Sequence, residues 1–364
     1  MTGILVHEWL SPTGGSENVF EELIRTFPDA ETWCLWNASE GRFLGVQETF
    51  LARTPLKGRK AASVPFMPLA WRTLPSREAD WILCSSHAFA HQARFSGAAR
   101  DAPKLVYAHT PARYVWVPET DQRGDRVMAR AVSGLMRPLD RRRAREAHAI
   151  AANSRYVAER VANTWEREAK VIYPPVDVAR FAAEPALSSE ELHILESLPE
   201  TFVLGASRFV PYKRLEDALR AGAVTGTPVV LAGGGPDELR LRALAHESAV
   251  PVHFVVDPSH DLLNALYRRA AVFIFAPVED FGIMPVEAMA AGTPVVVNAR
   301  GGAAESVMDG VTGAHVHDWA DSELRRAVET AAGVDRRDVS ARAADFGVDV
   351  FRERVATWVS AVSR

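Results

Sequence analysis

The chain has 364 residues, of which 48% are hydrophobic and 24% charged, and its formal net charge is −4. This length exceeds what one hydrophobic core usually serves, so we expect two domains. The balanced charge excludes a general electrostatic attraction for nucleic acid, and no apolar run reaches the ~18 residues that a membrane span needs. Cys34 and Cys84 have no partner at metal-ligand spacing and indicate a reducing compartment. We therefore expect a cytoplasmic protein without a leader segment.

Short apolar runs alternate with helix-period segments along the whole chain, which is typical of parallel βα units. The predicted strands are Ile4–His7, Thr32–Leu35, Trp81–Cys84, Lys104–Tyr107 and Ala149–Ala152 in the first half, then Phe202–Ala206, Pro228–Ala232, Val252–Val255, Ala271–Phe275 and Thr293–Val297 in the second. Two prolines in Val171–Asp177 break the pattern between the halves. The sequence therefore predicts an α/β protein of two Rossmann-like domains, with parallel sheets facing across a cleft where ligands bind.

The strongest chemical signal is Glu279–Ala290, which follows a predicted buried strand. We expect Glu279 and the Gly282 backbone at a strand-to-helix turn, facing the positive end of a helix dipole, where a phosphate is stabilised. Glu287 would lie about a turn inside that helix, able to bond a ribose or a sugar hydroxyl. Taken alone, the two glutamates would more often be solvated carboxylates on an ordinary helix.

A basic segment, Ser207–Arg214, directly follows another predicted strand. Arg208 and Lys213 at a strand's carboxyl end would form a good clamp for a diphosphate, since charge-assisted hydrogen bonds are strong. Without further context, a solvated basic loop would explain the same residues.

Three glycine segments and one histidine complete the candidates. Gly15, in Pro12–Glu17 before a predicted helix Asn18–Thr26, would let backbone amides approach an anion closely. The segment lacks the dinucleotide-binding fingerprint, and a bare tight turn remains open. Gly233–Pro236 and Gly301–Glu305 are predicted first as turns, with closeness to a nucleotide as a second role. His109, at the end of a strand, could contact a sugar or serve as a structural histidine.

Two basic clusters concern partners. Arg137–Arg145 lies on a predicted helix, and Lys57–Lys60 precedes the apolar stretch Val64–Leu69. Both could face anionic lipid headgroups or a phosphorylated acceptor. A solvated helix face and a surface loop are the favoured explanation, and peripheral contact with the inner face of a membrane stays open.

These segments occur together and in order, and the sequence resembles the family 4 retaining glycosyltransferases of the GT-B fold. The likeness runs from Val6–Leu10 to the helix around Phe351. It is greatest to the branch with a His-Thr-Pro-x-Arg-Tyr-x-Trp segment, here His109–Trp116, which includes O-antigen and exopolysaccharide mannosyltransferases. Asn153–Ala158 and Val171–Asp177 are also similar to that branch.

The resemblance implies roles for individual residues. Glu279 would contact the donor sugar, Glu287 the ribose, and His109 would lie near the donor sugar. The predicted catalytic residues are Glu279, His109, Arg208 and Lys213, and the predicted donor contacts are Gly15, Arg208, Lys213, Gly234, Phe281, Gly282, Ile283 and Glu287.

In this fold the last helix, here Val348–Ser363, crosses back onto the N-terminal domain. We thus expect an acceptor domain of residues 1–177 joined by 348–364, and a donor domain of residues 178–347.

The implied reaction transfers a hexose, with mannose favoured, from a nucleotide-diphosphate sugar to a glycan, lipid-linked or small-molecule hydroxyl. GDP-mannose is the favoured donor, and UDP- or dTDP-hexoses stay open. We expect no cofactor and no metal, because the chain has no Asp-x-Asp pair.

Three other functions are compatible with parts of this pattern. A nucleotide-sugar epimerase would share the GT-B fold, and a non-catalytic subunit would bind the nucleotide sugar without reacting it. A nicotinamide-dependent dehydrogenase is disfavoured because Glu238 stands where its fingerprint requires a third glycine.

Overall fold

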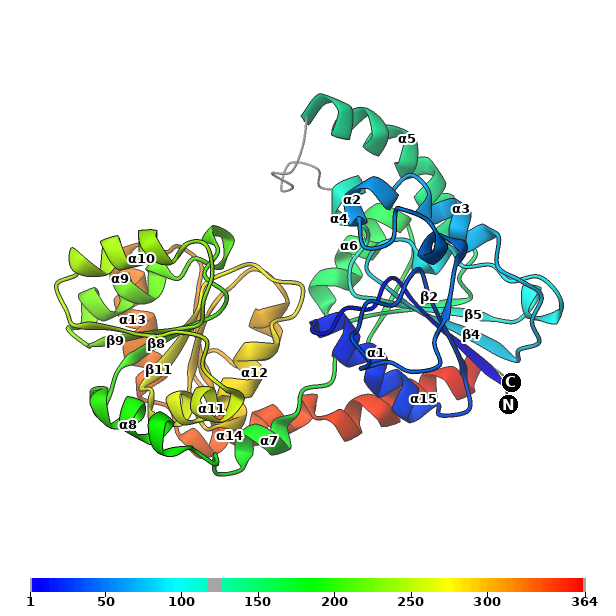
Figure 1. Ribbon diagram of the computed structural model, residues 1–364. Helices are drawn as coiled ribbons and strands as arrows, with labels where there is room; N and C mark the ends of the chain where they lie inside the picture. The colour runs from blue at the N-terminus through cyan, green and yellow to red at the C-terminus, as the bar shows by residue number, and fades with distance from the viewer. Residues whose placement is uncertain (1, 117–125, 363–364) are drawn as a thin grey trace. The chain divides into compact units, whose positions relative to one another are not determined.

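The computed structural model describes residues 2–116 and 126–362. The chain divides into two compact units (Figure 1): an N-terminal unit of Met1–Pro175 with Asp349–Arg364, and a C-terminal unit of Val176–Val348. The sequence predicts these changes of unit at 177/178 and 347/348.

The N-terminal unit contains a parallel sheet in the order β3-β2-β1-β4-β5-β6-β7. Its strands are β1 (Gly3–His7), β2 (Glu31–Cys34), β3 (Gln47–Glu48), β4 (Trp81–Ser86), β5 (Lys104–Ala108), β6 (Ala149–Ala152) and β7 (Lys170–Val171). The strands at the two edges, β3 and β7, have two residues each and were not predicted, because so short a run carries no periodic pattern. The order reverses between β1 and β4, which makes the carboxyl ends of these strands a switch point.

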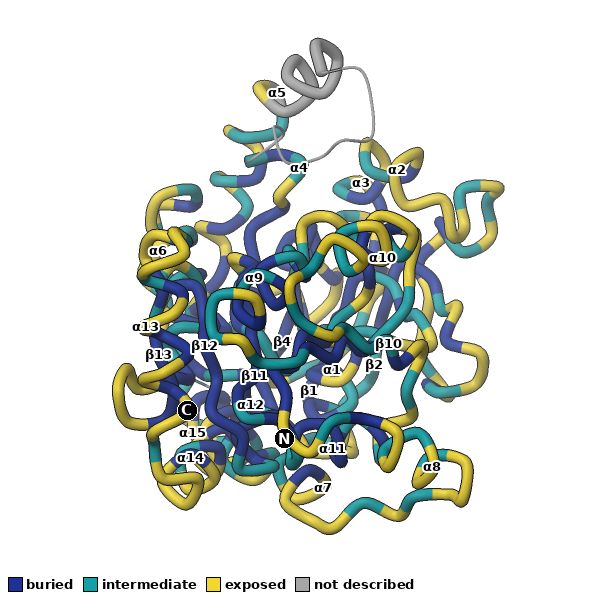
Figure 2. The backbone as a smooth tube through the Cα atoms, turned by 90° about the vertical axis from the view of Figure 1, so that its left-hand side faces the viewer, coloured by how far each residue is buried: buried dark blue, intermediate teal, exposed yellow. Residues whose placement is uncertain are grey.

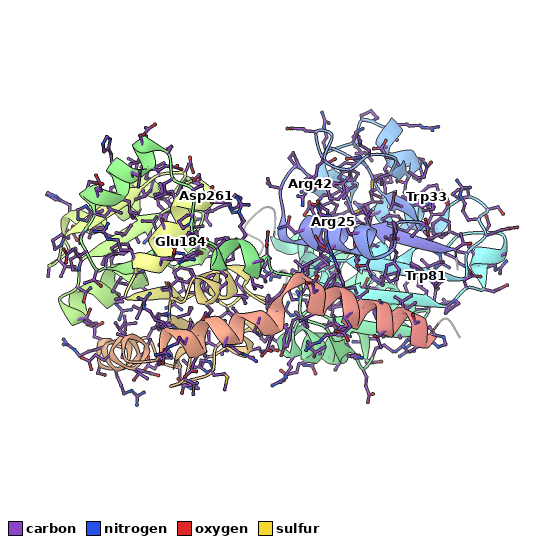
Figure 3. The ribbon with its side chains drawn as sticks, turned by 90° about the horizontal axis from the view of Figure 1, so that it is seen from below. Arg25, Trp33, Arg42, Trp81, Glu184 and Asp261 are labelled. Carbon is purple, nitrogen blue, oxygen red and sulfur yellow. The ribbon has the colours of Figure 1, made fainter. Side chains whose placement is uncertain are left out.

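Helices cover both faces of this sheet. They are α1 (Gly15–Thr26), α2 (Lys60–Ser63), α3 (Met67–Arg72), α4 (Arg113–Trp116), α5 (Arg126–Ala144), α6 (Arg155–Trp165) and α15 (Val348–Val362). On one face, α1 and α15 share an apolar cluster that contains Phe20, Phe351 and Trp358. Arg352 of α15 forms an ion pair with Glu22 of α1 at 2.6 Å. Figure 3, seen from below, shows α15 running beside the helix that carries the labelled Arg25.

The C-terminal unit contains a second parallel sheet, in the order β10-β9-β8-β11-β12-β13. Its strands are β8 (Val203–Ala206), β9 (Val229–Ala232), β10 (Val252–Val255), β11 (Val272–Phe275), β12 (Val295–Asn298) and β13 (Gly313–Val316). The edge strand β13 was not predicted, because Gly313 and His315 interrupt its apolar run. Most strands of both sheets are buried, as the dark blue segments of Figure 2 show.

The helices of the C-terminal unit are α7 (Val178–Ala182), α8 (Ser189–Ser197), α9 (Glu216–Thr225), α10 (Glu238–His246), α11 (His260–Arg269), α12 (Ile283–Ala290), α13 (Asp321–Ala332) and α14 (Arg336–Ala343). Local signals fix several starts: Ser188 and Glu191 form a capping box for α8, and Ser259 caps α11. The strand order reverses between β8 and β11, so the loops that follow these two strands share one edge of the sheet. Across the described part of the chain, no helix is long and apolar enough to cross a membrane.

Candidate functional site

The loops after β8 and β11 are joined by an ion pair. Lys213 Nζ lies 2.7 Å from Glu279 Oε1, with side-chain exposures of 13% and 23%. The same ammonium lies 5.8 Å from the ring centroid of Phe275, at the end of β11. The structure thus brings together two predicted site residues that stand 66 positions apart in the sequence.

Arg208 belongs to the same loop as Lys213 but is exposed, and its Nη2 lies 3.1 Å from the hydroxyl of Tyr212. The base of this loop is fixed by Phe209, whose amide donates to the carbonyl of Gly234 at 2.8 Å. Arg208 therefore presents a positive charge from a firmly held backbone.

The glycines after β9 allow this close approach between loops. A Cβ at Gly233 would lie 1.9 Å from the carbonyl oxygen of Ser207, and one at Gly235 would lie 2.6 Å from that of Phe209. At Gly234 the clash would be with a carboxylate oxygen of Asp257, at 2.4 Å. These glycines are required for packing, which is the first role that the sequence predicts for them.

The segment from Glu279 to Ile283 forms the turn between β11 and α12. Gly282 adopts the left-handed region with φ 94° and precedes Ile283, the first residue of the helix. The first amides of the helix have no partner within it and can bind an anion. Phe281 is buried, and its ring lies 5.7 Å from that of Phe346. The predicted contact of Phe281 with a donor is therefore limited to its backbone.

A short 3-10 segment holds this turn in place. The amide of Gly302 donates to the carbonyl of Glu279 at 2.8 Å. A Cβ at Gly302 would lie 2.0 Å from the carbonyl oxygen of Asp280, so only glycine allows this approach.

Glu287 lies in α12 and is half-buried. The pKa of Glu287 is raised to about 7, chiefly by burial; the nearby Arg180 opposes this shift and Asp177 adds to it. Burial also raises the pKa of Tyr267, with a smaller contribution from the Glu287 charge. Glu287 is therefore a carboxyl group whose ionisation near neutral pH depends on what approaches it.

In the N-terminal unit, His109 follows β5 and joins a chain of buried polar groups. Its Nε2 lies 2.8 Å from Ser85 Oγ in β4, and that oxygen lies 3.0 Å from Nδ1 of His7 in β1. The relative exposures of His109, Ser85 and His7 are 9%, 0% and 0%. His7 and Ser85 lie at the carboxyl ends of β1 and β4, and His109 directly follows the neighbouring β5.

Gly15 is the first residue of α1, and Gly14 is its N-cap. The predicted start at Asn18 is wrong: the helix begins three residues earlier, and its first turn includes Glu17. The Glu17 carboxylate lies over Gly14, where a Cβ would be 2.1 Å from Oε2. An acidic group thus already occupies part of this helix N-terminus, where negative charge is favoured.

Several buried polar residues escaped prediction. Glu8 is fully buried and accepts hydrogen bonds from the amides of Ala88 and Ala90 at 2.8 and 2.6 Å. Asp140 accepts from the indole nitrogens of Trp116 and Trp165 at 2.8 and 2.7 Å. Trp116 of the His109–Trp116 segment therefore has a structural role. For Glu8, the sequence signal that could have been used is a charged residue directly after an apolar strand.

The basic clusters make contacts within the chain. Arg141 and Arg145 both pair with Glu166, and Arg143 pairs with Glu146. The Lys60 ammonium lies over the ring of Trp9 at 4.8 Å. These contacts support the solvated-face explanation; contact with a membrane stays a prediction.

Residues 2–116 and 126–362 contain no group of three or more His, Cys, Asp or Glu side chains that could hold a metal ion. His109 and Gly15 belong to the N-terminal unit, and the other predicted site residues belong to the C-terminal unit.

Comparisons with known proteins agree with this arrangement. Residues 13–180 match the family described as Glycosyltransferase Family 4, and residues 193–333 match Glycosyl transferases group 1. The D-inositol 3-phosphate glycosyltransferase of Mycobacterium avium is 36% identical over 201 residues, covering 49% of this chain and 46% of that protein. The GDP-mannose-dependent alpha-(1-6)-phosphatidylinositol monomannoside mannosyltransferase of Mycolicibacterium smegmatis is 34% identical over 228 residues, covering 57% and 58%.

A solved structure of similar fold is Anabaena Alr3699/HepE in complex with UDP, with a TM-score of 0.71 and 20% identity over 98% of this chain and 100% of that one. The chain spans about half the length of the curated relatives that it matches. It belongs to family 4 of the glycosyltransferases and has the GT-B fold. The predicted family and the predicted class of two Rossmann-like domains are thereby confirmed.

Proposed function

We propose that the chain is a retaining glycosyltransferase that moves a hexose, with mannose favoured, from a nucleotide-diphosphate sugar to an acceptor hydroxyl. The Lys213–Glu279 pair carries this proposal. It lies at the switch point of the C-terminal sheet, beside the left-handed Gly282 that precedes α12. A cation, a carboxylate and a helix N-terminus on one sheet edge suit a diphosphate and the sugar bonded to it.

The charges suggest how the donor reacts. When the bond from the anomeric carbon to the phosphate oxygen breaks, the sugar becomes oxocarbenium-like and the nucleotide diphosphate gains negative charge. Lys213, Arg208 and the first amides of α12 would stabilise that charge. The acceptor oxygen bonds to the anomeric carbon on the face that the leaving group vacates, and its proton passes to the departing phosphate oxygen.

Glu279 and Glu287 would bind the donor at two other points. Glu279 reaches Lys213 and would contact sugar hydroxyls, whereas Glu287 would accept hydrogen bonds from the ribose. His109 would contribute near the donor sugar, and Gly15 near the phosphates. In this proposal the reaction uses no cofactor and no metal ion.

GDP-mannose remains the favoured donor, since one relative at 34% identity is described as GDP-mannose-dependent. UDP-hexoses stay candidates because a neighbour of the same fold was solved in complex with UDP. The names of the relatives also favour an acceptor that carries an inositol phosphate group, either D-inositol 3-phosphate, which is a small molecule, or a phosphatidylinositol monomannoside, which is lipid-linked. Glycan and other small-molecule acceptors remain within the proposal.

The test is a transfer assay with GDP-mannose, UDP-glucose and dTDP-glucose in the presence of a chelator, followed by NMR of the product's anomeric proton. We expect one donor to give a product of the donor's own anomeric configuration at an unchanged rate with chelator. An inverted product, or activity that requires added metal, would contradict the proposal. Conversion of the donor to its epimer without acceptor would instead favour an epimerase.

A further inference from the structure

The buried polar chain in the N-terminal unit has a feature that the proposed function does not use. Ser85 lies between two histidines, 2.8 Å from His109 Nε2 and 3.0 Å from His7 Nδ1. A hydroxyl has one hydrogen, so it donates to one of these nitrogens and accepts from the other. The direction of the Ser85 hydroxyl therefore links the tautomer of His7 to the tautomer of His109.

His7 is held neutral and in one orientation. Burial lowers its pKa well below the ordinary value, with smaller contributions from His87 and His109. Its ring stacks on Phe20 with centroids 4.8 Å apart and an interplanar angle of 23°. Burial likewise lowers the pKa of the neighbouring His87 to about 3.

The two directions of the chain are not equivalent. Nε2 of His7 is buried and has no hydrogen-bond partner among the described residues. If Ser85 donated to His7, that unpartnered Nε2 would carry a hydrogen, and a buried N–H that donates to nothing loses its hydration without a bond in return. If His7 Nδ1–H donates to Ser85, the unpartnered atom carries only a lone pair, and the Ser85 hydroxyl donates onward to His109 Nε2.

We propose that Ser85, oriented by His7, fixes His109 as the tautomer that carries its proton on Nδ1. The same contact would hold the His109 ring in position for the donor sugar. Ser85 and His7 are thus positioning residues that act through His109. The inference rests on the proposed role of His109, but the tautomer itself can be measured without any reaction.

The strand order explains why these residues can do this. Ser85 pairs with His7 in the β1–β4 register and with Tyr107 in the β4–β5 register. The His109 amide donates to the carbonyl of Ser86 at 2.8 Å, which continues the ladder past the end of β5. The backbone therefore fixes all three side chains at one edge of the sheet.

The direct test is the ¹⁵N NMR spectrum of the histidine rings in the full chain, with the His109 signals assigned by their loss in His109→Asn. In the wild-type protein we expect His109 protonated at Nδ1, and in Ser85→Ala we expect this preference to be lost. Ser86→Ala is the matched control, because Ser86 is equally buried in β4 but bonds Glu8 and His91 instead. A wild-type His109 protonated at Nε2, or an unchanged spectrum in Ser85→Ala, would overturn the inference.

Kinetics test the consequence. Ser85→Ala should lower kcat by ~10–100-fold with little change in the donor KM, the range seen when partners that orient metal-bound histidines are removed. In a His109→Ala background the same substitution should cause no further loss, whereas an independent structural role would give additive losses.

If Ser85→Ala does not fold, His7→Phe keeps a ring on Phe20 and removes Nδ1, so the His109 preference should weaken in that variant too. Full turnover of His109→Ala would count against the proposed role of His109 while leaving the tautomer result standing.

Discussion

The Lys213 ammonium lies 2.7 Å from a carboxylate oxygen of Glu279 and joins the loop after β8 to the loop after β11. Both side chains are partly exposed, so the pair is accessible to a ligand and partly screened by water. A donor diphosphate that bound Lys213 would compete with or extend this contact. The two residues should therefore respond differently to substitution.

Lys213→Ala should lower turnover by ~10²–10³-fold, the scale for losing one preorganised charge stabiliser. The measurement is the initial transfer rate at saturating donor. Arg242→Ala is a matched control, because Arg242 also combines an ion pair, with Glu238 at 2.8 Å, and a ring contact, with Phe254 at 4.3 Å. Near-wild-type turnover in Lys213→Ala would remove this loop from the reaction.

Glu279→Gln should have opposite effects on binding and on reaction. A partly exposed ion pair contributes ~0.2–1 kcal/mol, so a released Lys213 should bind the free nucleotide diphosphate up to ~5-fold more tightly. Turnover should fall, because the carboxylate that we expect at the donor sugar is gone. Calorimetric titration with the nucleotide diphosphate, beside the transfer assay, checks both; weaker nucleotide binding with full turnover would be the contrary result.

Glu287 predicts a dependence of stability on pH. In the native protein the pKa of the Glu287 carboxyl group is about 7, whereas its ordinary value is 4.5. Stability is therefore lost as pH rises from about 4.5 through 7, because ionising the buried carboxyl costs free energy only in the native state. The difference in unfolding free energy between Glu287→Gln and the wild type, measured in urea, should shift by ~1–3 kcal/mol in favour of the variant from pH 5 to pH 8. A difference that does not change with pH would contradict this cause.

The same carboxyl group predicts a dependence of donor binding on pH. If the ionised Glu287 accepts hydrogen bonds from the ribose, donor binding releases a proton near neutral pH. Donor affinity should then rise between pH 6 and pH 8 in the wild type and stay flat in Glu287→Gln. Parallel profiles for the two proteins would exclude the ribose contact.

Gly302→Ala should disturb the donor turn from behind. Its Cβ would lie 2.0 Å from the carbonyl oxygen of Asp280, so the backbone around Glu279 must move, at a cost of ~1–3 kcal/mol in stability and with lower turnover. Gly333→Ala is the control, because its nearest atoms lie 3.6 Å away and its backbone is right-handed. That variant should be neutral or stabilised by ~0.4–1 kcal/mol. Thermal unfolding and initial rates of both variants provide the check, and equal behaviour would argue against a supporting role for Gly302.

The fold was largely predictable because its central strands are apolar runs of four or more residues. The edge strands β3 and β7 were missed since two residues show no period, and β13 because its Gly313 and His315 resemble a loop. The start of α1 was placed too late because glycines occupy its N-cap, Gly14, and its first position, Gly15.

The candidate site was predictable in its parts but not in its contacts. Lys213 and Glu279 were each expected after a strand, yet only the adjacency of β8 and β11 brings them together. His7 and Ser85 were hidden inside strand runs, because their link to His109 depends on the order of β1, β4 and β5. The buried side chain of Phe281 could not be foreseen from a segment that otherwise suits a ligand loop.

The most direct measurement is a thermal-shift titration of the purified protein with GDP-mannose, UDP-glucose and dTDP-glucose, without added metal, in the wild type and in Arg208→Ala and Lys213→Ala. Ligands that bind the native state raise its apparent stability. We predict a shift with one nucleotide sugar that is lost in both variants. No shift with any donor, or an equal shift in both variants, would contradict a nucleotide-sugar site built on the loop after β8.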